Sequence, residues 1–459
     1  MSAEVHSAAP AKRALDEDPD HDAVAAERHA AMKRQANEEE KQMVEASASK
    51  VKHVDIHPND EELRADTSPL PKSTSTLQFS PGLHLAPMVR IGSLPTRLLS
   101  LRYGADLVWS PEIVDRAIFG CDRTVDEKSG LVAFSREGKH IFTTHPVERQ
   151  RVIFQLGSAS PQWAYQAISF VTANDDVAGV DLNCGCPKPF STIGGMGAGL
   201  LSTPDLLCDV LRAMRRAAPA HVSVSCKIRL LPTKEATQAL VRQIIRTGTI
   251  DALTVHCRTK DMRPRQPALP HRLQEVIDVV QEETAGELPL ILNGDAWDAP
   301  EARRLMKQTG VQAVMMARGP EGNASSFRSD GGVLSVASVV APQWVRLALS
   351  LDNQPGNTKY CLNSMAFKAT SSVSPNAKPL QPPPGLPRDT KQKMVEIRQG
   401  LAKSKTVEDL ARALGVDPDE QKKIPIDEVL REVREAIERS SSSKEGNDSG
   451  TEMSEKPAA

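Results

Sequence analysis

A cysteine in a glycine-rich loop is the residue of this chain best placed to do chemistry. Cys186 follows a β-type run, residues 177–182, and the turn that carries it starts just after Asn183. Loops at strand ends often hold the reactive groups of α/β proteins, and a thiol acts there as a nucleophile or as an acid. The alternative is a structural cysteine in a turn of small residues. We take Cys186 as the candidate catalytic residue.

Polar side chains recur at the ends of strand-like runs further along the chain. They are Gln155, Asn183, Lys227, His256, Asn293 and Arg318, spaced on average by about 33 residues. Taken singly, His256 could be a structural histidine and Lys227 could belong to an ion pair. Because the spacing equals one strand–helix unit, six such residues in phase indicate one shared site.

Strand and helix signals alternate regularly between the polar ends of the chain. Strands are expected at residues 83–87, 106–109, 152–156, 179–182, 222–228, 252–255, 288–292 and 313–316. Ser160-Pro161, Thr203-Pro204 and Asp298 are typical helix starts. Eight such units predict an α/β fold, a (β/α)8 TIM barrel. An open doubly wound sheet is the rival, but no Gly-x-Gly-x-x-Gly motif follows the first strand.

The chain divides by composition into a barrel, a helical domain and polar tails. We expect a disordered tail at residues 1–80, the barrel at 81–335, a helical domain at 336–439 and a second disordered tail at 440–459. A Pro/Ser-rich linker at 371–387 interrupts the helical domain. Its helices are expected at 342–351, 391–403, 406–414 and 427–439. Thr406 with Asp409 resembles a capping box, and Gly415 is a helix stop.

Composition excludes several classes of protein. The seven cysteines lack disulfide-scaffold spacing and no apolar signal segment precedes them, which indicates a reducing compartment, the cytoplasm or also the nucleus. No Cys/His cluster completes a zinc site, so no metal is expected. No apolar run reaches the ~18 residues of a membrane span. Residues 1–80 carry 16 acidic and 10 basic side chains, which leaves residues 81–439 mildly basic and compatible with a nucleic-acid substrate.

The polar strand ends have the chemistry of a flavin mononucleotide (FMN) site. Gln155 and Lys227 suit the pyrimidine edge of the flavin, where a cation near N1 stabilises the reduced form. The loops after the last two strands suit the phosphate. The expected cofactor contacts are Pro87, Met88, Val89, Gln155, Lys227, His256, Asn293, Gly294, Asp295, Ala317 and Arg318.

A basic cluster follows the strand at 252–255. It comprises Arg258, Lys260, Arg263, Arg265 and Arg272, against the single acid Asp261. Such a cluster on the active face is a candidate for contacts to RNA phosphates. The alternative is a solvated loop.

Several motifs together resemble one enzyme family. They are LAPMV (85–89), FQLG (154–157), DLNCGCP (181–187), STIGGMGAGLL (191–201), CKIRLLP (226–232), VHCRT (255–259), LNGD (292–295) and MMARG (315–319). In order and spacing they resemble the tRNA-dihydrouridine synthases. NTKYCL (357–362) and the loop GGMGAGLL are similar to the eukaryotic branch that acts on position 20, fungal members in particular.

The resemblance implies an FMN-dependent enzyme that uses NADPH to reduce the C5–C6 bond of a D-loop uridine, uridine 20, in tRNA. It implies that Cys186 gives a proton to C5 and that Asn183 hydrogen-bonds the uracil edge. Arg229, Arg258, Lys260, Arg263 and Arg265 would contact the RNA, and the target base would be flipped out. No oligomer is implied.

Three other functions remain open from the sequence. One is an FMN-dependent reductase of a free pyrimidine, similar to the dihydroorotate dehydrogenases. Another is an aldolase-type barrel that uses Lys227 as a Schiff base. The third is a catalytically inactive RNA-binding protein, against which the intact Cys186 argues.

Overall fold

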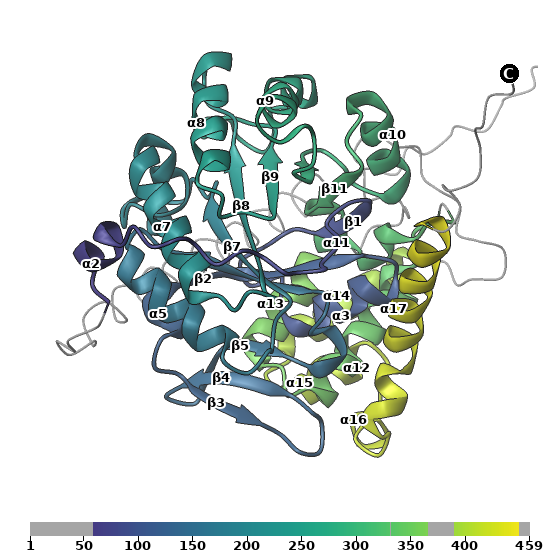
Figure 1. Cartoon of the computed structure of the whole chain (residues 1–459). Coiled ribbons are helices and arrows are strands. Elements are labelled where there is room, and N and C mark those ends of the chain that lie inside the picture. Colours follow the sequence, from purple (N-terminus) through teal and green to yellow (C-terminus); the bar gives the residue numbers. More distant parts are fainter. Residues whose placement is uncertain (1–57, 331, 366–389, 449–459) are drawn as a thin grey trace, which may run out of the picture. The chain divides into compact units, whose positions relative to one another are not determined.

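The computed structural model describes residues 58–330, 332–365 and 390–448. Its centre is a closed parallel barrel with the strand order β1-β11-β10-β9-β8-β7-β6-β2 (Figure 1). The strands are β1 (Gly82–Leu85), β2 (Leu107–Val114), β6 (Val152–Gly157), β7 (Gly179–Cys184), β8 (Ser223–Arg229), β9 (Ala252–His256), β10 (Leu290–Asn293) and β11 (Ala313–Met316). Each predicted strand is present, and the pairing of β1 with β2 closes the barrel, which confirms the (β/α)8 fold.

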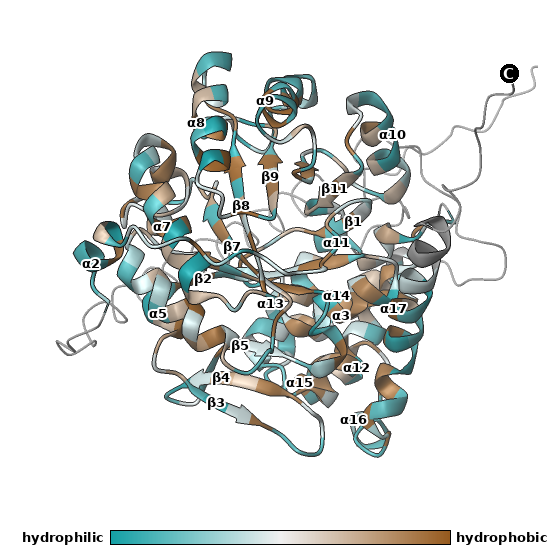
Figure 2. Ribbon diagram, in the orientation of Figure 1, coloured by the Kyte–Doolittle hydropathy of each residue, from teal (hydrophilic) through white to brown (hydrophobic). Residues whose placement is uncertain are grey.

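Helices cover the outside of the barrel and shield the outward side chains of its strands. They include α3 (Leu94–Arg102), α5 (Pro161–Thr172), α7 (Pro204–Ala217), α8 (Lys234–Arg246), α9 (Gln274–Thr284) and α10 (Ala299–Thr309). Ser160 and Asp298 cap α5 and α10 as predicted, whereas Thr203 precedes α7 without a side-chain hydrogen bond. In Figure 2 the strands β8 and β9 are hydrophobic, and α8 carries hydrophilic turns.

A ring of apolar side chains fills the amino-terminal half of the barrel interior. It contains Leu107, Trp109, Ile153, Ala252, Ile291, Ala313 and Met315. Phe79, from the segment before β1, joins it with its ring centroid 6.4 Å from that of Trp109. Since apolar side chains occupy this half, the polar chemistry is expected at the carboxyl-terminal end of the barrel.

The segment before the barrel corrects the expectation of a disordered tail at residues 1–80. Residues 58–80 are ordered: α2 (Asp60–Ala65) starts with a capping box formed by Asn59 and Glu62. Leu63 and Phe79 are buried, and the Thr74 amide donates to the carbonyl of Ala220 at 2.8 Å. The polar composition concealed these two apolar anchors. Residues 1–57 of the predicted tail lie outside the described residues.

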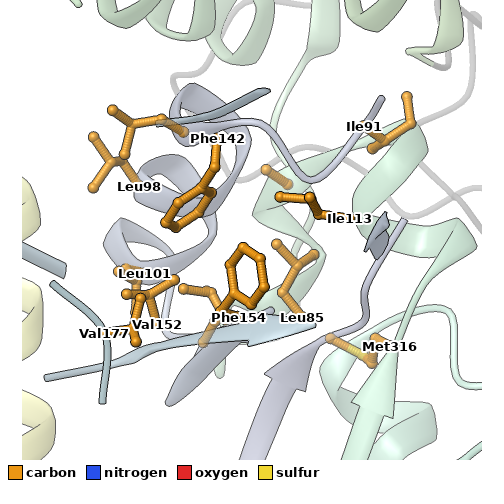
Figure 3. Close-up of a cluster of buried hydrophobic side chains, with 14 of the residues drawn as sticks. Leu85, Ile91, Leu98, Leu101, Ile113, Phe142, Val152, Phe154, Val177 and Met316 are labelled. Carbon is orange, nitrogen blue, oxygen red and sulfur yellow. The ribbon is translucent and has the colours of Figure 1, made fainter. Parts of the chain in front are cut away.

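A three-stranded antiparallel sheet, absent from the sequence prediction, is inserted between β2 and β6. It consists of β3 (Asp122–Val125), β4 (Val132–Arg136) and β5 (Lys139–Thr144), and follows the short helix α4 (Asp115–Ile118). Phe142 from β5 packs edge-on against Phe154 of the barrel, with ring centroids 5.2 Å apart (Figure 3). Beside it, Arg97 and Glu148 form a fully buried ion pair at 2.6 Å. The insertion is thus bound firmly to the barrel.

Helices follow the barrel. They are α12 (Ala341–Ser350), α13 (Pro355–Ser364), α14 (Lys391–Lys403), α15 (Val407–Ala413), α16 (Pro418–Gln421) and α17 (Ile426–Asp448). The four helices predicted after the barrel are present, and α13 and α16 are found in addition. The capping box of Thr406 and Asp409 is present, and Gly415 has a φ of 73°. Because α17 continues to Asp448, the predicted tail at 440–459 is wrong for residues 440–448. The predicted linker at 371–387 lies outside the described residues.

The helical segment packs against the barrel through α3. The indole N–H of Trp344 in α12 donates to Thr96 Oγ1 at 2.9 Å, and α17 lies along α3 (Figure 1). None of the helices in the described part of the chain is long and apolar enough to cross a membrane.

Candidate active site

The predicted strand-end residues meet at the carboxyl end of the barrel. Side chains alternate along a strand, so a residue two positions beyond an inward apolar side chain also faces inward. In register, Asn183 lies beside Lys227, and His256 lies beside both Arg229 and Asn293. Gln155, Asn183, Lys227 and Asn293 are all buried. Arg318 opens the short helix α11 (Arg318–Gly322) directly after β11. The structure therefore brings the six residues to one end of the barrel.

A buried carboxylate, Asp181, ties three strands together beneath this site. Its two oxygens accept hydrogen bonds from Gln155 Nε2 and from Ser225 Oγ, each at 2.7 Å. Burial raises the pKa of Asp181 to about 6, against the lowering effect of these two donors. Asn183 Nδ2 in turn donates to Gln155 Oε1 at 3.1 Å. The motif containing Asp181 was noted in the sequence, but its structural role was not.

Asn183 shapes the loop that carries the cysteine. Its Oδ1 accepts hydrogen bonds from the backbone N–H groups of Gly185 and Cys186, at 2.9 and 3.0 Å. The Ala198 amide donates to the Cys186 carbonyl at 2.9 Å and closes the loop from its far side. The side-chain amide nitrogen of Asn183 carries two N–H bonds. One donates to Gln155, so one donor remains.

The two neighbouring thiols have different surroundings. Cys184 is fully buried within β7, where it joins the hydrophobic core. Cys186 is half-buried, while the other six cysteines are buried. The pKa of Cys186 is raised to about 12, by burial first and then by the negative charge of Glu112. At neutral pH Cys186 is therefore a thiol, the form that can donate a proton.

The basic side chains at the strand ends have strongly lowered pKa values. Burial lowers the pKa of Lys227 to about 8, with the charge of Arg229 as the next cause. Burial and the nearby cations, first Lys227, push the pKa of His256 well below its usual value, so the imidazole is neutral. His256 Nε2 lies 3.2 Å from a nitrogen of Arg258. Because a guanidinium can only donate, Nε2 accepts and the proton resides on Nδ1.

Arg229, predicted to touch RNA or the base, is occupied within the protein. It is 8% exposed, and it donates to the carbonyls of Gly185 at 2.6 Å and Thr259 at 3.0 Å. These bonds link the cysteine loop to the loop after β9. Arg229 thus supports the position of Cys186.

A second carboxylate, Asp295, organises the rim after β10 and β11. It accepts hydrogen bonds from Arg258 at 2.6 and 2.8 Å, from Arg318, and from the Ala268 amide at 2.7 Å. The Arg318 guanidinium stacks over the Trp297 ring, 4.3 Å from its centroid. Two cations against one carboxylate leave this rim with a positive charge.

The rim leaves no room for a side chain at Gly319. A Cβ atom there would lie 1.8 Å from the Trp297 carbonyl oxygen. Nearby, Asn293 Nδ2 donates to the Met315 carbonyl at 2.9 Å. The backbone of the two rim loops is therefore held in close contact.

The remaining predicted residues lie in three places: after β9, after β1, and at the ends of β10 and β11. Arg258 is 4% exposed and faces the rim, whereas Lys260, Arg263 and Arg265 are exposed on the loop after β9. Pro87, Met88 and Val89 are half-buried after β1, and Met88 packs against the core. Gly294 and Ala317 lie at the ends of β10 and β11.

Sequence reasoning missed Glu112, Asp181 and Trp297 as parts of the site. Glu112 lies three residues beyond the predicted strand at 106–109, and no local pattern in the sequence indicated it. Among the described residues, no group of three or more His, Cys, Asp or Glu side chains could hold a metal ion.

The role of Asn183 can be tested without any ligand. We expect Asn183→Ala to speed hydrogen exchange of the Gly185 and Cys186 amides and to lower the free energy of unfolding by about 3 kcal/mol, about 1 for each of the three lost side-chain hydrogen bonds. The matched control is Thr254→Val, because the buried Thr254 hydroxyl has no hydrogen-bond partner in the described part of the chain. Unchanged exchange at both amides would contradict this role.

Comparison with known proteins places the chain among relatives of one kind. A family model described as dihydrouridine synthase (Dus) matches residues 84–344. A tRNA-dihydrouridine(20) synthase (NAD(P)+) of Schizosaccharomyces pombe is 46% identical over 296 residues, which cover 63% of this chain and 60% of that protein. The protein of that name in Saccharomyces cerevisiae is 41% identical over 300 residues, covering 61% of this chain and 76% of that protein.

A more distant relative is the tRNA-dihydrouridine(20a/20b) synthase (NAD(P)+) of Saccharomyces cerevisiae, 29% identical over 241 residues. The alignment covers 52% of this chain and 60% of that protein. The family match includes every strand of the barrel after Leu83 and the whole cysteine loop. The chain belongs to the dihydrouridine synthase family.

Proposed function

We propose that this protein is a flavin-dependent tRNA-dihydrouridine synthase that reduces the C5–C6 bond of a D-loop uridine, uridine 20, with NADPH as the reductant. The observation that carries the proposal is a buried lysine and a half-buried thiol at one end of the barrel. Lys227 is 9% exposed and makes no hydrogen bond within the described residues. The names of the two fungal relatives support the substrate and the nicotinamide reductant.

The residues at the strand ends fit FMN. An unbonded, buried ammonium needs an anionic or polar partner, which the N1 side of a flavin supplies. Gln155 and Asn183 each keep one amide N–H beyond the hydrogen bonds described above. At the rim, the net positive charge of Arg258 and Arg318 around Asp295 matches a phosphate. We therefore assign FMN as the flavin.

When bound and reduced, the flavin supplies a hydride for C6 of the uracil. The protein's own residues then have three tasks. Lys227 holds positive charge beside the cofactor, Asn183 offers its remaining N–H to the uracil edge, and Cys186 gives its proton to C5. The pKa of Cys186, about 12, keeps the sulfur protonated until the C5 carbanion forms.

We assign tRNA binding to the loop after β9 together with the helices after the barrel. Lys260, Arg263 and Arg265 are exposed and follow the carboxyl end of β9, on the same side as Cys186. Arg258, in contrast, is bound to Asp295 and serves the rim. Exposed cations at the mouth suit a polyanion better than a free pyrimidine.

The flavin assignment is tested by an absorbance spectrum and by release of the cofactor. The purified protein should be yellow and should release FMN on denaturation. Lys227→Ala should weaken FMN binding or slow its reduction by NADPH, because the positive charge near N1 is lost. A colourless protein that FMN cannot reconstitute would exclude a flavoenzyme.

The cysteine assignment is tested by a pair of variants. Cys186→Ala should slow dihydrouridine formation in tRNA by about 10²–10⁴-fold, the usual contribution of a positioned acid. NADPH should still bleach the flavin, because that half-reaction does not use the thiol. Cys184→Ala should have little effect on dihydrouridine formation. The reverse pattern would show that the proton donor is Cys184.

The RNA assignment is tested by the salt dependence of tRNA binding. Replacing Arg263 and Arg265 by Ala should weaken binding and flatten the slope of log K against log salt by about 1 for each lost phosphate contact. The matched control is Arg304→Ala with Lys307→Ala, which removes the same charge from the exposed face of α10. Equal slopes in the two double variants would place the RNA elsewhere.

A further inference from the structure

A buried carboxylate, Glu112, stands against the Cys186 thiol, and beyond its effect on the pKa of that thiol it has been given no role so far. Its side chain is 9% exposed and comes from β2. The thiol donates a hydrogen bond to this carboxylate, and Ser191 Oγ donates another to Glu112 Oε1 at 3.1 Å. Glu112 therefore holds the cysteine loop at two points.

The backbone around Glu112 is built to bring it there. The register between β2 and β6 shifts between Trp109 and Glu112, which marks a bulge in β2. Bulges commonly re-aim a side chain next to an active site. On the neighbouring strand, a Cβ atom at Gly157 would lie 2.8 Å from Glu112 Oε1, so a larger residue there would displace the carboxylate from this position.

The cysteine loop is equally tight on its other side. Gly197 has a φ of 57°, and a Cβ atom there would lie 2.3 Å from Ser191 Oγ and 3.0 Å from Cys186 Cβ. The thiol, the serine hydroxyl and the carboxylate are therefore packed together with little freedom. A buried carboxylate is costly to maintain, which favours a functional reason for its presence.

The charged side chains around the Cys186 thiol indicate a function for the Glu112 carboxylate. Lys188 lies on the same loop, and Lys227 and Arg229 reach it from β8. These three cations favour the thiolate, which cannot act as an acid. Glu112 from β2 opposes them, and together with burial it raises the pKa of Cys186. Asp181 of β7 adds negative charge below, beside Cys184.

We propose that Glu112 is the positioning residue of the proton donor: its carboxylate accepts the S–H hydrogen bond, fixes the Cys186 side chain and keeps the sulfur protonated beside the cations of the site. This role rests on the proposed function. During the reaction the S–H bond breaks, the C5–H bond forms with the electron pair of C5, and the sulfur is left as a thiolate. Water then returns a proton to the sulfur, which repulsion between thiolate and carboxylate favours.

The test is the pH dependence of Cys186 alkylation in the full-length, flavin-loaded protein. Iodoacetamide reacts with the thiolate, and mass spectrometry of the peptide that contains Cys186 gives the rate. In wild-type protein the alkylation rate of Cys186 should show no inflection near the ordinary thiol pKa of about 8.5. Glu112→Gln keeps the shape and an acceptor for Ser191, and should speed alkylation at pH 8 by about tenfold or more.

Asp115→Asn is the matched control. Asp115 is a second buried carboxyl that follows β2, but it accepts a hydrogen bond from Ser158 Oγ at 2.6 Å and is not in contact with the thiol. Its loss should leave the alkylation profile of Cys186 unchanged. Dihydrouridine formation by the Glu112→Gln variant should lose activity at a lower pH than wild type, because its thiol ionises earlier.

Identical alkylation profiles for wild type and Glu112→Gln, with normal dihydrouridine formation, would overturn the role of Glu112 alone. If the variant does not fold, the wild-type profile decides: an inflection near pH 8.5 overturns the proposal, and its absence supports it. A shifted profile in a wild-type protein that forms no dihydrouridine would instead overturn the proposed function. The alkylation measurement needs no tRNA, so the two failures are distinguishable.

Discussion

The site depends on one buried carboxylate in the barrel interior. Asp181 accepts hydrogen bonds from β6 through Gln155 and from β8 through Ser225, so it joins three adjacent strands at the level where the apolar packing ends. A carboxylate this deep is stable only with such donors. From Gln155 the chain of hydrogen bonds continues to Asn183 and from there to the backbone of the cysteine loop. The position of the thiol therefore follows from the packing of the strands beneath it.

The site also separates its charges along the mouth of the barrel. At the rim, Asp295 holds Arg258 and Arg318 together but leaves them with a net positive charge. At the cysteine loop, Glu112 offsets the nearby cations instead. One end thus suits an anionic group such as a phosphate, while the other suits a neutral thiol. The same kind of side chain produces opposite results because Asp295 binds two guanidinium groups directly, whereas Glu112 contacts a hydroxyl and the thiol.

The inserted sheet supports the barrel from outside at β2 and β6. The inserted sheet packs Phe142 against Phe154 on the neighbouring strand, as Figure 3 shows, and the buried pair of Arg97 and Glu148 fastens the segment between β5 and β6 to α3. The strand β2 contains a bulge and still pairs with β6 beyond it, since pairing resumes at Glu112 in a register shifted by one residue.

The sequence by itself determined the barrel, its strands and most of the residues at the strand ends, because parallel strands buried on both faces repeat a strong apolar signal and polar residues interrupt it in phase. It did not reveal the inserted sheet or the ordered segment at residues 58–80. The few apolar residues of these segments become buried only through contact with the rest of the fold, which no local pattern predicts. Only the tertiary structure decided that Arg258 and Arg229 face inward, since their partners Asp295 and Gly185 are distant in sequence. It also decided the contact of Glu112 with Cys186: a bulge in one strand and a glycine in the next bring together residues that no local pattern connects.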